Sequence, residues 1–420
     1  MVNSVYFEEK KSQLYKVLKY CFENVPYYKD NWNIEMVSES KFDYDFFSSH
    51  IPVLEKNNLK VNTDLFIADT FKKEYLKCDV TSGTEGKPMV CYKSEEERVR
   101  CSNALWMKRR SWVRDLTPRD RFARFYAFRS TEDKKLITNS VLYKDNDIHI
   151  PLFDMSGDKL SEYWNNIIEF KPRWMHGPST AIFNIAKHVK EYGLPKCEIE
   201  FVELNGEFVP QEHIDLIREV FGSKVANHYG SREFWAIGFS CHQDKIHILD
   251  KSVYVENVYN EECKANEILV TTLTNMAWPL VRYRIGDVAD VYINEDCSCT
   301  TKGKYCLDLK RGRRADYFKL KNGQTINAII FSGVARGLSN IEGRSVIYQY
   351  QVIKHTNSFL EIKLCMNEST SKRIEDIISK YNEELRKIIS NDIQIKYEIV
   401  DYILPDSKTG KCKDFIDLSK

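Results

Sequence analysis

The strongest constraint on the fold of this chain is a strand, turn, helix and strand pattern between residues 199 and 229. Ile199–Leu204 is an apolar run that predicts a buried strand, and Asn205-Gly206-Glu207 predicts a turn after it. Pro210–Phe221 predicts a helix with proline at its start, and Val225–Tyr229 predicts the next strand. This order predicts a parallel α/β unit, in which ligands bind beyond the carboxyl ends of the strands. Short strands alternate with helices from about residue 80 to 290, so we expect a large α/β domain with parallel or mixed sheets.

The last part of the chain, roughly one hundred residues, follows a different pattern. Val346–Ile353, Phe359–Leu364 and Ile393–Tyr402 alternate like strands. Between the second and third of these strands, apolar residues recur at helical spacing and mark one helix face: Ile374, Ile377, Ile378, Tyr381, Leu385, Ile388 and Ile389. We therefore predict a large domain over residues 1–312 and a small α+β domain over residues 313–420.

Composition narrows the class of protein. The chain has 420 residues and nearly balanced charge, with 62 basic and 61 acidic residues. No basic stripe indicates a nucleic-acid partner, and no apolar run is long enough for an export signal or a membrane span. Twelve cysteines without such a signal predict reduced thiols, which favour metal binding over disulfides. We expect a cytoplasmic protein that binds neither nucleic acid nor membrane; composition does not indicate its oligomeric state.

Residues Thr81–Met89 (TSGTEGKPM) form a run of hydroxyls and glycines that ends in Lys87. Glycines let a backbone approach a ligand closely, so several N–H groups, hydroxyls and one ammonium can converge on a polyphosphate. The run is not a P-loop of the Walker kind, because only two residues separate Gly83 from Gly86 and Pro88 follows the lysine. A polar surface turn is the alternative interpretation of this run taken alone.

Four further motifs follow in order: Tyr229-Gly230-Ser231-Arg232-Glu233, Tyr283-Arg284-Ile285-Gly286-Asp287, Gly312-Arg313-Arg314-Ala315-Asp316 and Thr409-Gly410-Lys411. With the run at residue 81, they make the chain resemble the adenylate-forming superfamily of acyl-CoA synthetases and related adenylation domains. Within it, the likeness is to the phenylacetate-CoA ligase branch, including CapK-like proteins. The motifs extend from Thr81 to Lys411, so the resemblance covers nearly the whole chain.

The resemblance implies an ATP site whose parts have separate roles. The phosphate loop would bring Lys87 to the β- and γ-phosphates, the turn at Gly206 and Glu207 would lie along the adenine, and Tyr229 would offer it a flat face. Asp287 would accept the ribose hydroxyls and Glu233 would contact Mg²⁺. The full set of implied ATP-binding residues is Thr81, Ser82, Gly83, Thr84, Gly86, Lys87, Gly206, Glu207, Tyr229, Gly230, Ser231, Asp287 and Arg313.

Lys411 is the implied catalytic lysine of the small domain, because a cation there could bridge the attacking carboxylate and the α-phosphate. Lys87 and Glu233 complete the implied catalytic set, and Lys413 is the alternative to Lys411. Each of these charged residues could instead be a solvated surface residue, and Asp287 could be a turn residue beside Gly286.

Two residues depart from the family pattern. Glu85 stands where the family usually has threonine or serine, so this carboxylate must point outward, reach Mg²⁺ or weaken catalysis. Ala315 stands at the hinge position that often carries aspartate or lysine, with Asp316 next in the chain. Either the pivot has moved by one residue or the domain swing differs.

We expect the acyl pocket to be lined by two segments that precede the adenine turn, Phe122–Phe128 and Trp174–Ser179. Apolar and aromatic lining suits an aryl or other hydrophobic acid. The candidate substrate-binding residues are Phe125, Tyr126, Phe128, His176 and Gly177. For each aromatic residue, a place in the hydrophobic core is an equal alternative.

A cluster of cysteines and histidine predicts zinc. Cys241 lies close before His247, and Cys297-Ser298-Cys299 follows later with Cys306 beyond. The likeness to the phenylacetate-CoA ligase branch favours four ligands, Cys241, His247, Cys297 and Cys299, with Cys306 as a substitute. Such a closed tetrahedral site would be structural and would tie two loops together. Reduced thiols without metal are the alternative.

The resemblance thus implies an ATP- and Mg²⁺-dependent carboxylate ligase, similar to phenylacetate-CoA ligase. It would form an acyl-adenylate from a small carboxylic acid and pass the acyl group to a thiol, expected to be coenzyme A. One alternative acceptor is a carrier-protein arm or an amine. Another alternative is a non-catalytic nucleotide-binding relative, which Glu85 and Ala315 suggest.

Overall fold

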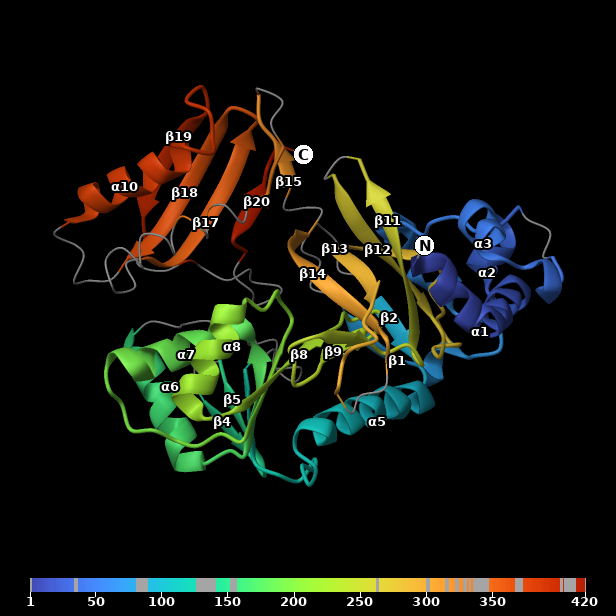
Figure 1. Cartoon of the computed structure of the whole chain (residues 1–420), viewed down its shortest axis with the longest axis horizontal. Coiled ribbons are helices and arrows are strands. Elements are labelled where there is room, and N and C mark those ends of the chain that lie inside the picture. Colours follow the sequence, from blue (N-terminus) through green and yellow to red (C-terminus); the bar gives the residue numbers. More distant parts are fainter. Residues whose placement is uncertain are drawn as a thin grey trace. The chain divides into compact units, whose positions relative to one another are not determined.

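The structure is a computed structural model of the whole chain, divided into two compact units (Figure 1). It describes residues 2–33, 37–80, 90–125, 141–151, 157–261, 264–299, 303–313, 317–321, 325–327, 331, 334, 347–366, 373–400, 403 and 413–419. The first unit comprises residues 1–260 and 264–310, and the second comprises residues 261–263 and 311–420. Among the described helices, none is both long and apolar enough to cross a membrane.

The first unit is built on one sheet of twelve strands, in the order β11-β12-β13-β14-β10-β9-β8-β7-β6-β3-β5-β4. Five neighbouring strands are parallel to one another, and those around them pair antiparallel. The parallel strands are β3 (Phe122–Phe125), β5 (Asp147–Ile150), β6 (Trp174–Pro178), β7 (Phe201–Asn205) and β8 (Lys224–Tyr229). The others are β4 (Leu142–Lys144), β9 (Gly238–Ser240), β10 (Ile246–Ile248), β11 (Val253–Asn260), β12 (Ala265–Thr272), β13 (Tyr283–Ile293) and β14 (Tyr305–Arg313).

Helices cover both faces of the parallel strands (Figure 1). On one face lie α6 (Gly157–Phe170), α7 (Ser179–Glu191) and α8 (Gln211–Phe221). On the other lies α5 (Glu95–Trp112), which packs through Leu105 and Trp112. Helix α8 follows Pro210. The next residue after the helix is Gly222, whose φ of 68° is the left-handed conformation typical of helix C-terminal caps. The predicted strand, turn, helix and strand unit is therefore confirmed.

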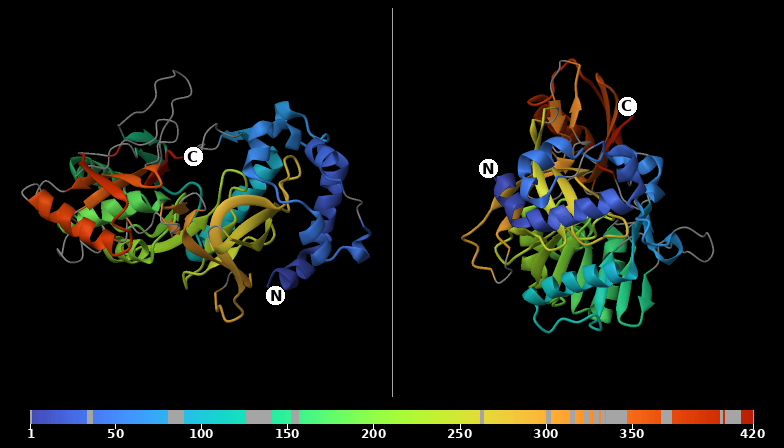
Figure 2. Two further views of the ribbon diagram at one scale, coloured as in Figure 1. Left: turned by 90° about the horizontal axis from the view of Figure 1, so that it is seen from above. Right: turned by 90° about the vertical axis from the view of Figure 1, so that its right-hand side faces the viewer.

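The N-terminal helices pack beside the antiparallel strands β11 to β13, as the two views of Figure 2 show. Their core is aromatic, with Tyr6, Phe7 and Phe47 around Tyr254 and with Phe42 packed on Phe7. The elements are α1 (Val2–Asn24), α2 (Pro26–Asn31), α3 (Tyr44–His50) and α4 (Lys56–Val61), with the 3-10 turns Glu39–Lys41, Thr63–Phe66 and Lys73–Tyr75 and the hairpin of β1 (Lys77–Val80) and β2 (Val90–Lys93).

The second unit is a small sheet with one described helix against it. Its four strands run in the order β19-β18-β17-β20, with β17 and β18 antiparallel and the outer two each parallel to their neighbour. Helix α10 buries the face predicted from the sequence, including Ile377, Tyr381 and Leu385. The elements are β15 (Tyr317–Lys319), β16 (Thr325–Asn327), β17 (Ile347–Thr356), β18 (Phe359–Met366), α10 (Ile374–Arg386), β19 (Gln394–Ile399) and β20 (Phe415–Asp417). The predicted α/β fold with a smaller α+β part is confirmed.

Candidate nucleotide and metal sites

The predicted adenine turn lies at the carboxyl edge of the parallel strands. Gly206 follows β7 with a φ of 76°, a conformation that residues with a side chain rarely adopt. The Glu207 carboxylate accepts a hydrogen bond from the backbone N–H of Thr180 in the first turn of α7, where the helix dipole favours negative charge. Strand β8 pairs with β7 and ends at Tyr229. The turn and Tyr229 are therefore neighbours at one edge of the sheet.

Two motifs that are far apart in sequence meet at this edge. The Tyr229 hydroxyl donates to the Asp287 carboxylate at 2.7 Å, and so joins the motif at residue 229 to the motif at residue 283. Gly230 has no room for a side chain, since a Cβ there would lie 2.0 Å from the carbonyl oxygen of Trp235. The backbone N–H of Trp235 donates a hydrogen bond to the carbonyl oxygen of Ser231 at 2.6 Å, and this bond closes the loop after β8.

Glu233 is held by a second contact between the same motifs. It is 7% exposed, and Oε1 accepts a hydrogen bond from the hydroxyl of Tyr283 at 3.0 Å. Oε2 has no hydrogen-bond partner among the described residues. Hard carboxylate oxygens are ligands that suit Mg²⁺. The geometry thus leaves one oxygen of this carboxylate available to a cation.

Lys93 lies beside the candidate nucleotide site and was not predicted from the sequence. It ends β2, the strand that follows the predicted phosphate loop, and its ammonium is buried. Nζ donates to the carbonyl oxygens of Arg232 at 2.8 Å and Glu233 at 3.1 Å. No sequence pattern distinguishes this lysine from a solvent-exposed one, because its partners lie 139 and 140 residues further along the chain. Lys93 fixes the backbone that carries Glu233.

Three of the five candidate acyl-pocket residues are described, and they lie on two neighbouring strands but on opposite faces of the sheet, with Phe125 and Gly177 on the face that α6, α7 and α8 cover and His176 on the other. Phe125 ends β3, and His176 and Gly177 lie on its parallel neighbour β6. A Cβ at Gly177 would lie 2.6 Å from the Cβ of Phe125, so only glycine allows this packing. Nε2 of His176 contacts the side-chain amide of Asn205. Asn205 is the last residue of β7 and directly precedes the adenine turn at Gly206.

The remaining predicted residues fall on parts of the chain that are not described. These are Thr81, Ser82, Gly83, Thr84, Gly86 and Lys87 of the phosphate loop, Tyr126 and Phe128 of the acyl segment, the departures Glu85, Ala315 and Asp316, and Lys411. Arg313 is the last residue of β14. The placement of these residues relative to the described site stays a prediction.

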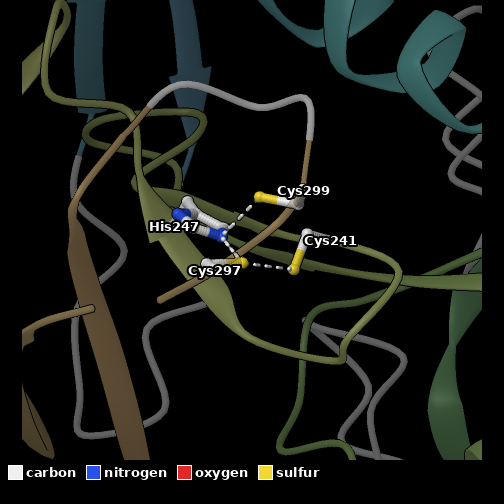
Figure 3. Close-up of side chains that lie close together, drawn as sticks. All are labelled: Cys241, His247, Cys297 and Cys299. Carbon is white, nitrogen blue, oxygen red and sulfur yellow. Dashed lines mark hydrogen bonds between the residues drawn. The ribbon is translucent and has the colours of Figure 1, made fainter. Parts of the chain in front are cut away.

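The predicted metal ligands form a compact cluster (Figure 3). Cys241 follows β9 and His247 lies on β10, its hairpin partner, whereas Cys297 and Cys299 follow β13. The Sγ atoms of Cys241 and Cys297 are 3.7 Å apart. Nε2 of His247 is 3.4 Å from Sγ of Cys297 and 3.2 Å from Sγ of Cys299. All four ligand atoms lie within 4.8 Å of one another.

These separations fit a tetrahedral zinc ion. With Zn–S bonds of about 2.3 Å and a Zn–N bond of about 2.0–2.1 Å, tetrahedral angles place two sulfurs about 3.8 Å apart and a sulfur and nitrogen about 3.6 Å apart. The observed 3.7, 3.4 and 3.2 Å are close to these values. Three thiolates and one imidazole are also a donor set typical of structural zinc. The residues present therefore fit this ion.

Cys306 contacts the opposite side of the histidine ring. It pairs with His247 across β10 and β14, and its Sγ lies 3.4 Å from Nδ1. Nδ1 also contacts the carbonyl oxygen of Gly303 at 2.5 Å. A ligating histidine usually donates its second ring N–H to such a carbonyl, which orients the ring. The geometry therefore favours Cys299 over Cys306 as the fourth ligand, with Cys306 and Gly303 orienting His247.

The surroundings of Cys241 favour its thiolate form. Burial alone would raise the pKa of this thiol, but hydrogen bonds from His247 and from the backbone N–H groups of Gln243 and Lys245 lower the pKa to about 6. The thiolate is the form that binds metals. The adjacent His242 lies outside the cluster, because its ring packs on Trp112, with 4.1 Å between ring centroids, and its Nε2 contacts the Ser111 carbonyl.

Comparison with known proteins shows which fold this chain shares. No family model matches the chain. Protein CapK of Staphylococcus aureus is 22% identical over 96% of this chain and 88% of its own length. The crystal structure of 2-hydroxyisobutyryl-CoA ligase in the postadenylation state superposes with a TM-score of 0.72, at 16% identity, over 97% of this chain and 88% of that chain. The chain has the fold of the adenylate-forming ligases. The resemblance predicted from the sequence motifs is thus confirmed.

A third similarity concerns an enzyme with a different product. The amide bond synthetase McbA from Marinactinospora thermotolerans superposes with a TM-score of 0.50, at 14% identity, over 81% of this chain and 68% of that chain. The fold of this chain therefore occurs both in a ligase named for coenzyme A and in a synthetase named for amide bonds. Fold alone does not select the acceptor.

Proposed function

We propose that this protein is an ATP- and Mg²⁺-dependent carboxylate ligase that forms an acyl-adenylate and transfers the acyl group to the thiol of coenzyme A. The observation that carries the proposal is the meeting of two distant motifs at the carboxyl edge of the sheet. Tyr229 contacts Asp287, and Tyr283 contacts Glu233, in a chain with the adenylate-forming fold. Ligands of open α/β sheets bind at this edge.

Each described residue has a role that its chemistry suits. Asp287 accepts hydroxyls of the ribose, and Tyr229 orients its carboxylate while offering a ring to the adenine. Glu233 would hold Mg²⁺ through the oxygen that Tyr283 leaves available, and the ion would supply positive charge to the phosphates. Lys87 and Lys411 supply positive charge around the phosphates in the proposed mechanism, where negative charge crowds as the carboxylate attacks the α-phosphorus.

The reaction separates into two balanced steps. In the first, a carboxylate oxygen of the acid bonds to the α-phosphorus of ATP while pyrophosphate leaves. In the second, the thiolate sulfur of coenzyme A bonds to the acyl carbon while AMP leaves. An aryl or other hydrophobic acid is proposed from the aromatic and apolar character of the two expected pocket segments, Phe122–Phe128 and Trp174–Ser179. This preference is the one expected of a phenylacetate-CoA ligase-like enzyme.

A second acceptor class is a specific alternative. The amide bond synthetase with the same fold favours an amine, and a carrier-protein thiol is the remaining choice. The discriminating measurement is acyl transfer from the adenylate to coenzyme A, to an amine or to a carrier-protein thiol. We propose coenzyme A because the family resemblance implies a thiol acceptor, and the transfer measurement decides between the three acceptors.

We also propose that Cys241, His247, Cys297 and Cys299 hold one structural Zn²⁺. The support is the match between their separations and tetrahedral geometry, together with the orienting contact of Nδ1 of His247. Such an ion would cross-link the hairpin of β9 and β10 to the segment after β13. All four ligand positions are filled by protein, so the ion would stabilise the fold and not act on substrate.

The test of the ligase proposal is pyrophosphate exchange into ATP with a panel of aryl, alkyl and hydroxy acids. The proposal predicts exchange with at least one acid and no exchange without acid. Addition of coenzyme A should then consume that acid and release AMP. ATP binding without exchange for any acid would favour the non-catalytic nucleotide-binding alternative.

A further inference from the structure

One lysine is buried beside the nucleotide motifs without a charged partner. Lys93 is 2% exposed, and its Nζ donates two hydrogen bonds, to the carbonyl oxygens of Arg232 at 2.8 Å and Glu233 at 3.1 Å. Among the described residues, no aspartate or glutamate side chain forms an ion pair with it. Both acceptors of this ammonium are therefore neutral backbone atoms.

Such an arrangement is costly for folding. Burial of an ammonium costs free energy, which an opposite charge offsets better than neutral carbonyl groups do. Lys354 gives the contrast, because this second buried lysine, 4% exposed, pairs with the Asp417 carboxylate at 3.2 Å. Lys93 lacks the stabilising partner that Lys354 has. Its burial therefore points to a role other than stability.

The chain around Lys93 is anchored on both sides. The carbonyl oxygen of Tyr92, the preceding residue, accepts a hydrogen bond from the buried side-chain amide of Asn275 at 3.0 Å. Ser94, the following residue, caps α5, since its hydroxyl oxygen accepts the backbone N–H of Glu97 at 3.1 Å. Lys93 thus extends its ammonium from a fixed backbone, and it can hold another segment in place.

The segment that it holds carries the proposed Mg²⁺ contact. Lys93 fixes the backbone carbonyl of Glu233, and the hydroxyl of Tyr283 on β13 fixes Oε1 of the same residue at 3.0 Å. The two contacts come from different elements and restrain the main chain and the side chain. On the proposed function, Oε2 is the oxygen that would face the ion. Groups that orient a metal ligand typically contribute about 10- to 100-fold in metal affinity.

We propose that Lys93 is a positioning residue for the Mg²⁺ site, which holds the Arg232–Glu233 segment so that Oε2 of Glu233 can bind the ion that accompanies ATP. Lys93 acts through Glu233 in this account, because both of its hydrogen bonds go to protein carbonyl oxygens. It also connects β2, which follows the predicted phosphate loop, to the motif at residue 229. The inference rests on the proposed function, which gives Glu233 its role.

The experiment measures ATP binding with and without Mg²⁺ by isothermal titration calorimetry, which needs no turnover. The Mg²⁺-free buffer contains no chelator, so the proposed zinc site is not disturbed. Lys93→Met removes the donor but keeps an unbranched side chain of similar length. We expect Mg²⁺ to tighten ATP binding in the wild type and Lys93→Met to lose about tenfold of that gain. The Kd for ATP without Mg²⁺ should stay within about twofold of wild type, because the variant leaves the contacts to the nucleotide itself in place.

Two further variants test how Lys93 acts. In a Glu233→Gln background, Lys93→Met should change the Mg²⁺ effect less than about twofold, because the residue through which it acts is already altered. Lys93→Gln is the conservative variant, since its amide can still donate a hydrogen bond to a carbonyl oxygen. The gain from Mg²⁺ in Lys93→Gln should lie between those of wild type and Lys93→Met.

Lys354→Met is the matched control, with the same substitution at the other buried lysine. It should keep the full Mg²⁺ effect but lower the urea midpoint, because Asp417 loses its partner. Lys93→Met should lower the urea midpoint less, because no buried carboxylate loses a partner. The pair of variants therefore separates an effect on Mg²⁺ from an effect on stability.

The outcomes separate this inference from the proposed function. An unchanged Mg²⁺ effect in Lys93→Met, or an equal loss in the Glu233→Gln background, would overturn the positioning role and leave the ligase proposal standing. An equal loss of ATP affinity with and without Mg²⁺ would do the same. ATP binding that Mg²⁺ does not tighten in the wild type would overturn the role of Glu233 and this inference with it. Absence of ATP binding by the wild type would overturn the ligase proposal itself.

Discussion

At the scale of single residues, Asp287 offers the sharpest test of the nucleotide site. Asp287→Ala removes the proposed ribose acceptor and should cost about 1.5–3 kcal/mol, or about 10- to 150-fold in kcat/KM for ATP. Asp290 is the matched control on the same strand, where it accepts a hydrogen bond from Asn266 at 2.7 Å. Asp290→Ala should leave kcat/KM for ATP within about twofold of wild type. An equal loss in both variants would contradict the assignment.

Glu203 gives a prediction about stability and pH. Burial alone would raise the pKa of Glu203, but attraction to Arg109 and a hydrogen bond from His228 hold it well below its usual value. The carboxylate therefore stabilises the fold above about pH 4.3, the unfolded-state value, and this contribution is lost as pH falls below it.

Glu203→Gln should lower the free energy of unfolding by about 3 kcal/mol at neutral pH, because it leaves Arg109 as an unpaired buried charge. Glu200→Gln is the control, since Glu200 pairs with Arg173 at the surface and should cost less than about 1 kcal/mol. Urea unfolding of wild type and both variants from pH 7 to about pH 2 measures these differences and their loss in acid. A variant as stable as wild type at pH 7 would show that the pair contributes no net stability.

At the scale of elements, the zinc proposal predicts a cross-link between the β9–β10 hairpin and the segment after β13. Protein purified without chelator should contain about one equivalent of zinc, and chelation should lower Tm more than it lowers kcat, because metal binding contributes folding free energy. Metal analysis by mass spectrometry and thermal unfolding are the measurements. Zinc far below one equivalent would contradict the site.

Cysteine variants distinguish ligands from orienting residues. Cys297→Ser should abolish zinc binding, whereas Cys306→Ser should weaken affinity about 10- to 100-fold, as loss of a group that orients a ligand typically does. Cys197→Ser is the control, because this cysteine lies outside the cluster. If Cys297→Ser retains zinc and Cys306→Ser loses it, Cys306 is the ligand and Cys297 is not.

Many of the helices and strands could be predicted from the sequence. Apolar periodicity located β7, α8 and β8 because each is buried in a regular pattern. The family resemblance grouped Cys241 and His247 with the later cysteines, and these side chains lie close together. Lys93 and the Arg109–Glu203 pair could not be found, because their partners are 94 or more residues away in sequence. A charged residue in a helix or strand pattern looks solvent-exposed until tertiary packing supplies its partner.

At the scale of the whole molecule, the proposed mechanism assigns Lys411 to one half-reaction only. A group that stabilises negative charge at the α-phosphorus accelerates adenylate formation and not thiol transfer. Lys411→Ala should therefore lose about 10²–10³-fold in adenylate formation but convert a supplied acyl-adenylate to thioester at a near-normal rate. Rapid-quench kinetics of the separate half-reactions measure this.

Lys413→Ala is the control for that variant and should keep both half-reactions. Equal losses of both half-reactions in Lys411→Ala would show that Lys411 is structural. Unchanged adenylate formation in Lys411→Ala, with a loss in Lys413→Ala, would move the role to Lys413.

The most direct test of the central claim follows an oxygen atom. When an acid that supports pyrophosphate exchange is labelled with oxygen-18 in its carboxylate, attack on the α-phosphorus places one labelled oxygen between the acyl carbon and phosphorus. Cleavage of the acyl–oxygen bond by coenzyme A then leaves that oxygen on AMP. The account predicts one labelled oxygen in each AMP formed, detected by mass spectrometry. Formation of ADP, or of AMP without the label, would contradict it.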